Sequence, residues 1–117
     1  MKRRLSKEQT QHLIDLGIAK EKATGKIEIQ NGNITDFEYR FTTDDLLETL
    51  SKSIQSEDFE DKQYRLRIEN TSKGWSACYA DTDGIPELYE WDSYYERTEL
   101  IDALYEVIVW CKNNNYL

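Results

Sequence analysis

The chain has 117 residues, which is room for one domain of ordinary size, and we expect a single domain over residues 1–117. Its formal net charge of -8 argues against broad binding to a nucleic-acid backbone, since that needs a dominant basic surface. No stretch approaches the roughly 18 consecutive apolar residues of a membrane-spanning helix, and the basic start is not followed by an apolar run. We therefore expect a cytoplasmic protein without a secretion signal.

The charge is distributed unevenly along the chain. Residues 1–26 carry seven Lys and Arg against three Asp and Glu, whereas residues 81–117 carry two against nine. Such asymmetry can steer partners or favour head-to-tail association. Ordinary solubility is the commoner reason for it.

Two cysteines and one histidine limit the metal chemistry of the chain. Cys78 and Cys111 do not form a Cys-x-x-Cys pair, and His12 is the only histidine, so a tetrahedral zinc site would lack its fourth soft ligand. Without a secretion signal, reduced core cysteines are expected. We expect neither a metal nor a cofactor.

The first predicted element is a helix over residues 7–16. Ser6 is followed three residues later by Gln9, which is the spacing of a capping box, and Gly17 supplies the left-handed residue that commonly ends a helix. His12 lies in this helix. It could act as a general base, but a helical histidine with no nucleophile in its sequence context is more often structural.

A period of two over residues 26–41 predicts a hairpin that turns at the Asn-Gly pair 31–32. Both turn residues tolerate the positive φ of a type I′ turn, and this turn would pair Ile29 with Ile34. The alternation of apolar and polar residues slips between Ile34 and Phe37, which predicts a bulge in the second strand.

A second helix is predicted to begin after Thr42, whose hydroxyl can cap a turn in which two acids complement the positive end of the helix dipole. The 3.6-residue stripe that continues this helix to about Gln55 consists of Leu46, Leu47, Leu50 and Ile54. The acidic residues 56–62 then predict a surface loop.

The middle of the chain predicts a three-stranded meander. Residues 63–69 alternate, with apolar side chains on one face and arginines on the other, and residues 75–79 repeat the pattern after a turn at 70–74. Residues 87–91 are a candidate third strand, because Pro86 can begin a strand without losing a ladder hydrogen bond.

The last segment has the strongest helical period, with Thr98 as its predicted cap. Its apolar face consists of Leu100, Ile101, Leu104, Val107, Ile108 and Cys111. Together the elements predict an α+β domain in the order α-ββ-α-βββ-α, with about three helices packed on one face of an antiparallel sheet.

Motifs for chemistry are few. Residues 81–84, Asp-Thr-Asp-Gly, resemble the opening of a calcium loop, but strands rather than helices are predicted around them, so a plain β-turn fits better. Glu87, Glu90, Asp92 and Glu96 are dense enough to suggest acid–base chemistry, yet no known catalytic motif accompanies them.

Aromatic and acidic side chains interleave between the last predicted strand and the last helix. Aromatic residues are enriched in protein-interface hot spots because they bury a large area at low entropy cost; alternatively, several of them close a small core. The candidate partner-binding surface consists of Glu87, Tyr89, Glu90, Trp91, Asp92, Tyr94 and Tyr95.

Helix caps and core stripes in three segments, residues 5–18, 41–47 and 99–110, are similar to those of a group of small uncharacterised proteins. Phages and other mobile elements of gut anaerobes carry this group. The resemblance spans most of the chain, although residues 19–25 depart from the pattern. It implies a shared fold and a mobile-element origin, and it carries over no catalytic residue.

These observations favour a non-enzymatic, acidic protein-interaction module that acts on a host protein. One alternative is a nucleic-acid mimic that inhibits a DNA-binding protein, which would need carboxylates spaced like duplex phosphates. A second is a small carboxylate-dependent enzyme, which would need a concave pocket that holds acids of raised pKa. We expect a monomer or an edge-strand homodimer, because the meander leaves an open edge.

Overall fold

A computed structural model describes residues 2–31, 34–55, 63–81 and 94–117 of the chain. Its helices are α1 (Lys7–Asp15), a short 3-10 helix η1 (Lys20–Lys22), α2 (Thr43–Thr49) and α4 (Leu100–Asn113). Its strands are β1 (Gly25–Asn31), β2 (Ile34–Arg40), β3 (Ser53–Gln55), β4 (Gln63–Thr71), β5 (Gly74–Asp81) and β6 (Tyr95–Arg97). All strand pairs are antiparallel, which confirms the predicted α+β class in an order close to the predicted one.

Local sequence dictates where the first two α-helices begin. The Ser6 hydroxyl accepts a hydrogen bond from the Gln9 amide at 3.1 Å, and the Gln9 side chain accepts one from the Ser6 amide at 3.0 Å. Thr42 and Asp45 form the same reciprocal box at the start of α2. After α1, Gly17 adopts a left-handed φ of 104°. These caps confirm the sequence prediction.

The strands β3, β4, β5 and β6 form one sheet in that order. Its centre is the β4–β5 hairpin, which turns between Thr71 and Gly74. The predicted alternation along β4 is confirmed, because Tyr64 is buried whereas Arg65 and Arg67 are exposed. One face of this sheet therefore packs against α4, and the arginines of β4 lie on the other.

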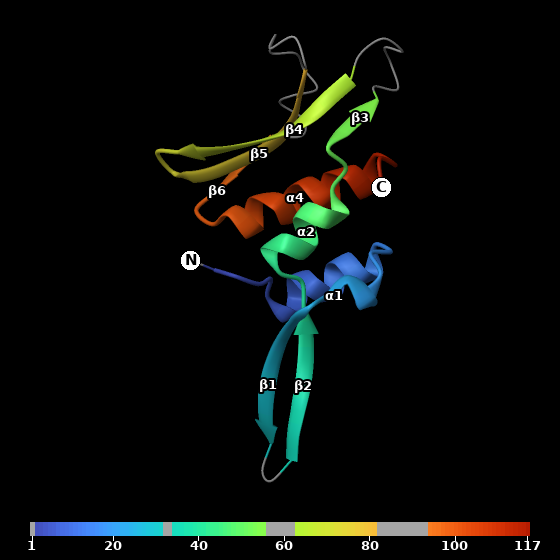
Figure 1. Ribbon diagram of the computed structural model, residues 1–117, viewed down its shortest axis with the longest axis vertical. Helices are drawn as coiled ribbons and strands as arrows, with labels where there is room; N and C mark the ends of the chain where they lie inside the picture. Colours follow the sequence, from blue (N-terminus) through green and yellow to red (C-terminus); the bar gives the residue numbers. More distant parts are fainter. Residues whose placement is uncertain (1, 32–33, 56–62, 82–93) are drawn as a thin grey trace.

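Helix α4 lies at the centre of the molecule, with the four-stranded sheet on one side and α1 and α2 on the other (Figure 1). A helix in this position must be apolar on more than one face, and its buried residues are Ile101, Ala103, Leu104, Val107, Ile108, Trp110 and Cys111. Tyr79 of β5 and Leu46 of α2 belong to the same core. None of the described helices is long and apolar enough to cross a membrane.

The strands β1 and β2 form a separate two-stranded sheet that projects from α1, away from the four-stranded sheet (Figure 1). The molecule measures 58 × 31 × 17 Å, and its radius of gyration of 15.9 Å exceeds the roughly 13 Å of a compact domain of this length. Two core residues lie next to the hairpin in the chain: Ala23 shortly before β1 and Phe41 directly after β2. The hairpin is thus an arm attached to a body made of α1, α2, α4 and β3–β6.

The register of this hairpin differs from the predicted one. Ile29 pairs with Asp36, and Asn31 pairs directly with Ile34, so the connection begins one residue later than predicted. The one-to-one pairing continues along both strands, so the predicted bulge before Phe37 is wrong. Residues 31–33 are Asn-Gly-Asn, so both the pair 31–32 and the pair 32–33 suit a two-residue turn. Local turn propensity does not distinguish between the two pairs.

Helix α2 is shorter than predicted. It ends at Thr49, Leu50 is extended with ψ at 133°, and Ser53–Gln55 form β3. Ile54 is buried, but in the sheet opposite Tyr64. The helical spacing between Leu50 and Ile54 therefore joins two buried positions that belong to different elements.

The approach to α4 also differs from the prediction. Its N-cap is Glu99, which makes no side-chain cap hydrogen bond, and not Thr98. The strand β6 before it was not predicted. The predicted loop at 56–62, the turn residues 82–84 and the predicted strand at 87–91 lie outside the described residues.

Candidate partner-binding surfaces

Most of the predicted partner-binding surface, namely Glu87, Tyr89, Glu90, Trp91 and Asp92, lies outside the described residues. The two remaining members, Tyr94 and Tyr95, are partly buried. Tyr95 belongs to β6 and packs against the core, and the guanidinium of Arg97 lies 5.8 Å from its ring centroid. Tyr95 thus contributes to packing, and the surface as a whole stays a prediction.

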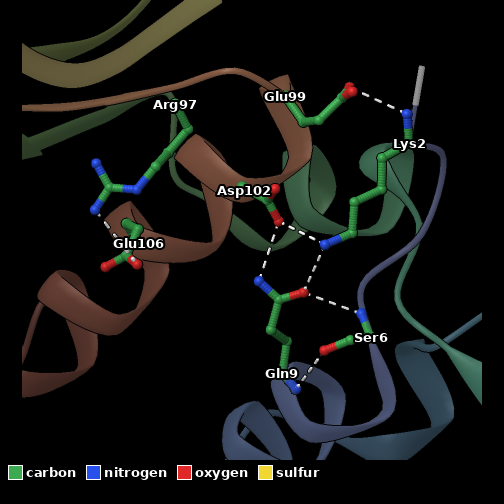
Figure 2. Close-up of polar contacts among 7 residues, drawn as sticks. All are labelled: Lys2, Ser6, Gln9, Arg97, Glu99, Asp102 and Glu106. Atoms are coloured by element: carbon green, nitrogen blue, oxygen red, sulfur yellow. Dashed lines mark hydrogen bonds and ion pairs between the residues drawn. The ribbon is translucent and has the colours of Figure 1, made fainter.

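A polar network fastens the start of the chain to α1 and α4 (Figure 2). Lys2 Nζ donates to Asp102 Oδ1 at 2.8 Å and to Gln9 Oε1 at 3.0 Å, and Gln9 Nε2 donates to the same Asp102 oxygen at 3.0 Å. The backbone amide of Lys2 donates to Glu99 Oε2 at 3.0 Å. These groups bind one another, so we assign the network a structural role: it holds the N-terminal segment in place.

Asp45, at the start of α2, is a carboxylate that is only 5% exposed. It accepts hydrogen bonds from the amides of Thr24 and Thr42 at 2.9 and 2.8 Å and from the Thr24 hydroxyl at 2.7 Å. Burial raises the pKa of this carboxyl, but the hydrogen bonds outweigh burial and hold the pKa below its ordinary value of 3.8. Because Thr24 directly precedes β1, Asp45 anchors the base of the hairpin.

His12, the candidate general base, contacts a phenol of α4. Its Nδ1 is hydrogen-bonded to the Tyr105 hydroxyl, and the two ring centroids lie 5.9 Å apart in an edge-on arrangement. Burial, and then the neighbouring charge of Glu106, raises the pKa of Tyr105. The contact joins α1 to α4 and supports the structural interpretation of His12.

Both cysteines are free and buried, as predicted. Burial raises the pKa of the Cys111 thiol to about 12, although a hydrogen bond with Tyr79 opposes the shift. The Tyr79 hydroxyl donates to the Ser51 carbonyl at 2.6 Å. The thiol packs in the core, where the raised pKa disfavours the thiolate. Within the described ranges, no three His, Cys, Asp or Glu side chains are grouped as a metal site requires.

A surface that the sequence did not indicate lies where the hairpin meets the body. Two hollows of about 200 and 430 Å³ share Lys20 and Tyr39, and we call them together the basal groove. Among the described residues, Tyr39 and Leu47 are the exposed large hydrophobic side chains, and Tyr39 is the more exposed at 50%. The groove is lined by Lys7, Thr10, Gln11, Ile14, Lys20, Glu21, Ala23, Glu38 and Tyr39.

Two cations of the basal groove have no counter-ion among the described residues. Among the residues that the structure describes, neither Lys7 nor Lys20 forms an ion pair. Glu38, across the groove, is already paired with Arg40 at 3.2 Å. Within the described parts of the chain, the buried Thr10 hydroxyl has no hydrogen-bond partner. Lys7, Lys20 and Thr10 thus line the groove beside the exposed ring of Tyr39.

A local signal for half of this groove was present in the sequence. Lys7, Gln11 and Ile14 follow one another at spacings of four and three, which places them on one face of α1. The other half comes from β2, and only the tertiary structure brings Tyr39 to this face.

Comparison with known proteins adds no assignment: neither a family model, nor a curated protein, nor a solved structure matches this chain.

Proposed function

We propose that the chain is a non-enzymatic protein-interaction module of a phage or mobile element, that it acts on a host protein in the cytoplasm, and that the β1–β2 hairpin and the basal groove bind this partner. One observation carries the proposal: the hairpin extends out of the body and leaves Tyr39 half exposed at its base. Large exposed aromatic rings are typical of interface hot spots.

The hairpin has the geometry of a docking strand pair. In the described part of the chain, β1 pairs only with β2, so each strand retains an edge of backbone donors and acceptors. An exposed edge can accept an extended segment of another protein by β-augmentation. Because an isolated two-stranded hairpin gains little stability by itself, a partner strand would stabilise it.

The base of the hairpin is held firmly, which suits a presented arm. Arg4 donates to the Lys26 carbonyl at 2.8 Å, and Asp45 holds Thr24. A Cβ at Gly25 would lie 2.7 Å from the Arg40 carbonyl oxygen, so the two strands approach closely at this point. Positioning by a rigid base lowers the entropy that a partner must remove on binding.

The test is affinity capture from host lysate treated with nuclease, at low and high salt, with three forms of the full chain. The first is the wild type, and the second has residues 28–37 replaced by an Asn-Gly turn, which leaves three paired positions at the base. The third neutralises the acidic segment with Glu87→Gln, Glu90→Gln and Asp92→Asn.

The proposal predicts one stoichiometric protein that survives high salt and is lost only with the shortened hairpin. If capture is lost only when the acidic segment is neutralised, the interface lies at residues 87–95 and the hairpin is not the binding site. Capture only of DNA-binding proteins, released at high salt, would support a nucleic-acid mimic instead. Capture of no specific protein by the wild type would overturn the proposed function.

A further inference from the structure

We propose that the basal groove binds a short acidic segment of the partner protein, with one carboxylate between Lys7 and Lys20 and an apolar or aromatic side chain against Tyr39. This inference rests on the proposed function and names the chemistry of the segment that the module recognises.

Two lysines give the smaller hollow positive charge. Lys7 projects from α1 and Lys20 from η1, both line the smaller hollow, and neither forms an ion pair within the described structure. By contrast, Lys2 and Arg40 are both paired with acids of this chain. Two unpaired ammonium groups on one small hollow favour an anion, and a carboxylate accepts charge-assisted hydrogen bonds from both.

The Thr10 hydroxyl is a second feature of the groove. Thr10 is 5% exposed and lines the smaller hollow, and its Oγ1 has no hydrogen-bond partner among the described residues. A buried hydroxyl without a partner costs roughly 1–3 kcal/mol. Oγ1 is itself shielded from solvent, so a polar group in the hollow reaches it only after the side chains of the groove shift; the bond then formed would remove this penalty.

The smaller hollow also has an apolar wall. Ile14 of α1 and the half-exposed ring of Tyr39 line the same hollow. Its volume of about 200 Å³ is room for one side chain. A charged group flanked by an apolar one therefore fits better than a lone ion.

A peptide suits this groove better than a phosphate backbone does. A nucleic-acid strand presents a row of charges, whereas Glu21 and Glu38 line the groove beside the two lysines. The net charge of -8 repels a long polyanion further. A segment with one or two carboxylates avoids most of this repulsion.

The test uses the full chain, labelled with ¹⁵N and titrated with an acetylated, amidated Glu-Phe-Gln-Glu peptide, with Gln-Phe-Gln-Gln as the matched neutral probe. We expect amide shift changes grouped at Lys7, Gln11, Lys20 and Tyr39, at peptide concentrations from about 0.1 to 5 mM. The Lys20→Glu variant should bind at least tenfold more weakly. Lys73→Glu, an equal charge change in the β4–β5 turn, should bind like the wild type.

Thr10→Val separates binding from folding. It removes the unpartnered hydroxyl at nearly constant volume, so its melting temperature should equal or exceed that of the wild type while its affinity for the glutamate peptide falls severalfold. Equal affinity for both peptides, equal weakening by Lys20→Glu and Lys73→Glu, or shift changes outside the groove would overturn the inference. If the glutamate peptide does not bind but capture still depends on the hairpin, the proposed function stands and only the proposal of an acidic ligand is wrong.

Discussion

Helix α4 and the β1–β2 hairpin are stabilised in opposite ways, although each is a regular element. Seven of the fourteen residues of α4 are buried, and the sheet and two helices surround it. In the hairpin, β1 and β2 pair only with each other among the described strands. The hairpin joins the body at its base. We therefore expect the body to be the more stable part, and the proposed recognition to use the hairpin and the groove beneath it.

The largest expected effect is in the body. Leu104 is fully buried in α4, so Leu104→Ala should lower the free energy of unfolding by about 2–5 kcal/mol through lost burial and a residual cavity. Leu47, which is 37% exposed on α2, provides the matched control, and Leu47→Ala should cost less than about 1 kcal/mol. Urea denaturation measures both, and equal losses would show that α4 is not the centre of the core.

The second effect concerns the close approach of β5 to β6. Gly74 has a φ of 135°, and a Cβ there would lie 2.5 Å from the Arg97 carbonyl oxygen, so Gly74→Ala should cost about 3 kcal/mol. At Gly17 the nearest atom is the flexible Lys112 Nζ at 3.4 Å, and Gly17→Ala should cost about 1 kcal/mol. Thermal denaturation of both variants measures the two losses of stability. A larger loss for Gly17→Ala than for Gly74→Ala would contradict this register of β6.

The third effect depends on pH. The pKa of Asp45 is lower in the folded chain than the ordinary 3.8, so its ionisation stabilises the folded state above that value, and this stabilisation is lost as the pH falls through the folded pKa. Asp45→Asn should therefore cost about 1–2 kcal/mol at pH 7 and progressively less below pH 4. Its exposed neighbour Asp44 is the control, since Asp44→Asn should change little at either pH. A constant cost of Asp45→Asn across pH would contradict the assignment.

The smallest effect is expected in the arm. Tyr39→Ala should change the free energy of unfolding by less than about 0.5 kcal/mol, because the ring is half exposed, yet it should abolish partner capture. Denaturation with guanidinium chloride measures the stability of the variant, and the capture experiment measures its binding. A loss above about 2 kcal/mol would make Tyr39 part of the core and remove it from the interface.

The sequence predicts features that depend on residues close together in the chain and misses features that depend on distant residues. The capping box of Ser6 and Gln9 was predictable because its partners are three residues apart. The end of α2 was not, because Ile54 is buried in the sheet opposite Tyr64, and helical spacing alone does not exclude a strand at that position.

The candidate surfaces divide in the same way. The acidic and aromatic composition of residues 87–95 is visible in the sequence, but composition does not place side chains in space. The basal groove needs Lys7 and Lys20 opposite Tyr39, and this arrangement depends on how the hairpin joins α1. No local pattern carries that information.

Native-state hydrogen exchange of the free full-length chain tests the central claim, that a stable body presents a weakly supported arm. The account predicts that the slowest amides of α4 exchange only through global unfolding, whereas the paired amides of β1 and β2 exchange at least about 100-fold faster. Protection of the hairpin amides equal to that of α4 would show that arm and body unfold as one unit, and would contradict the account.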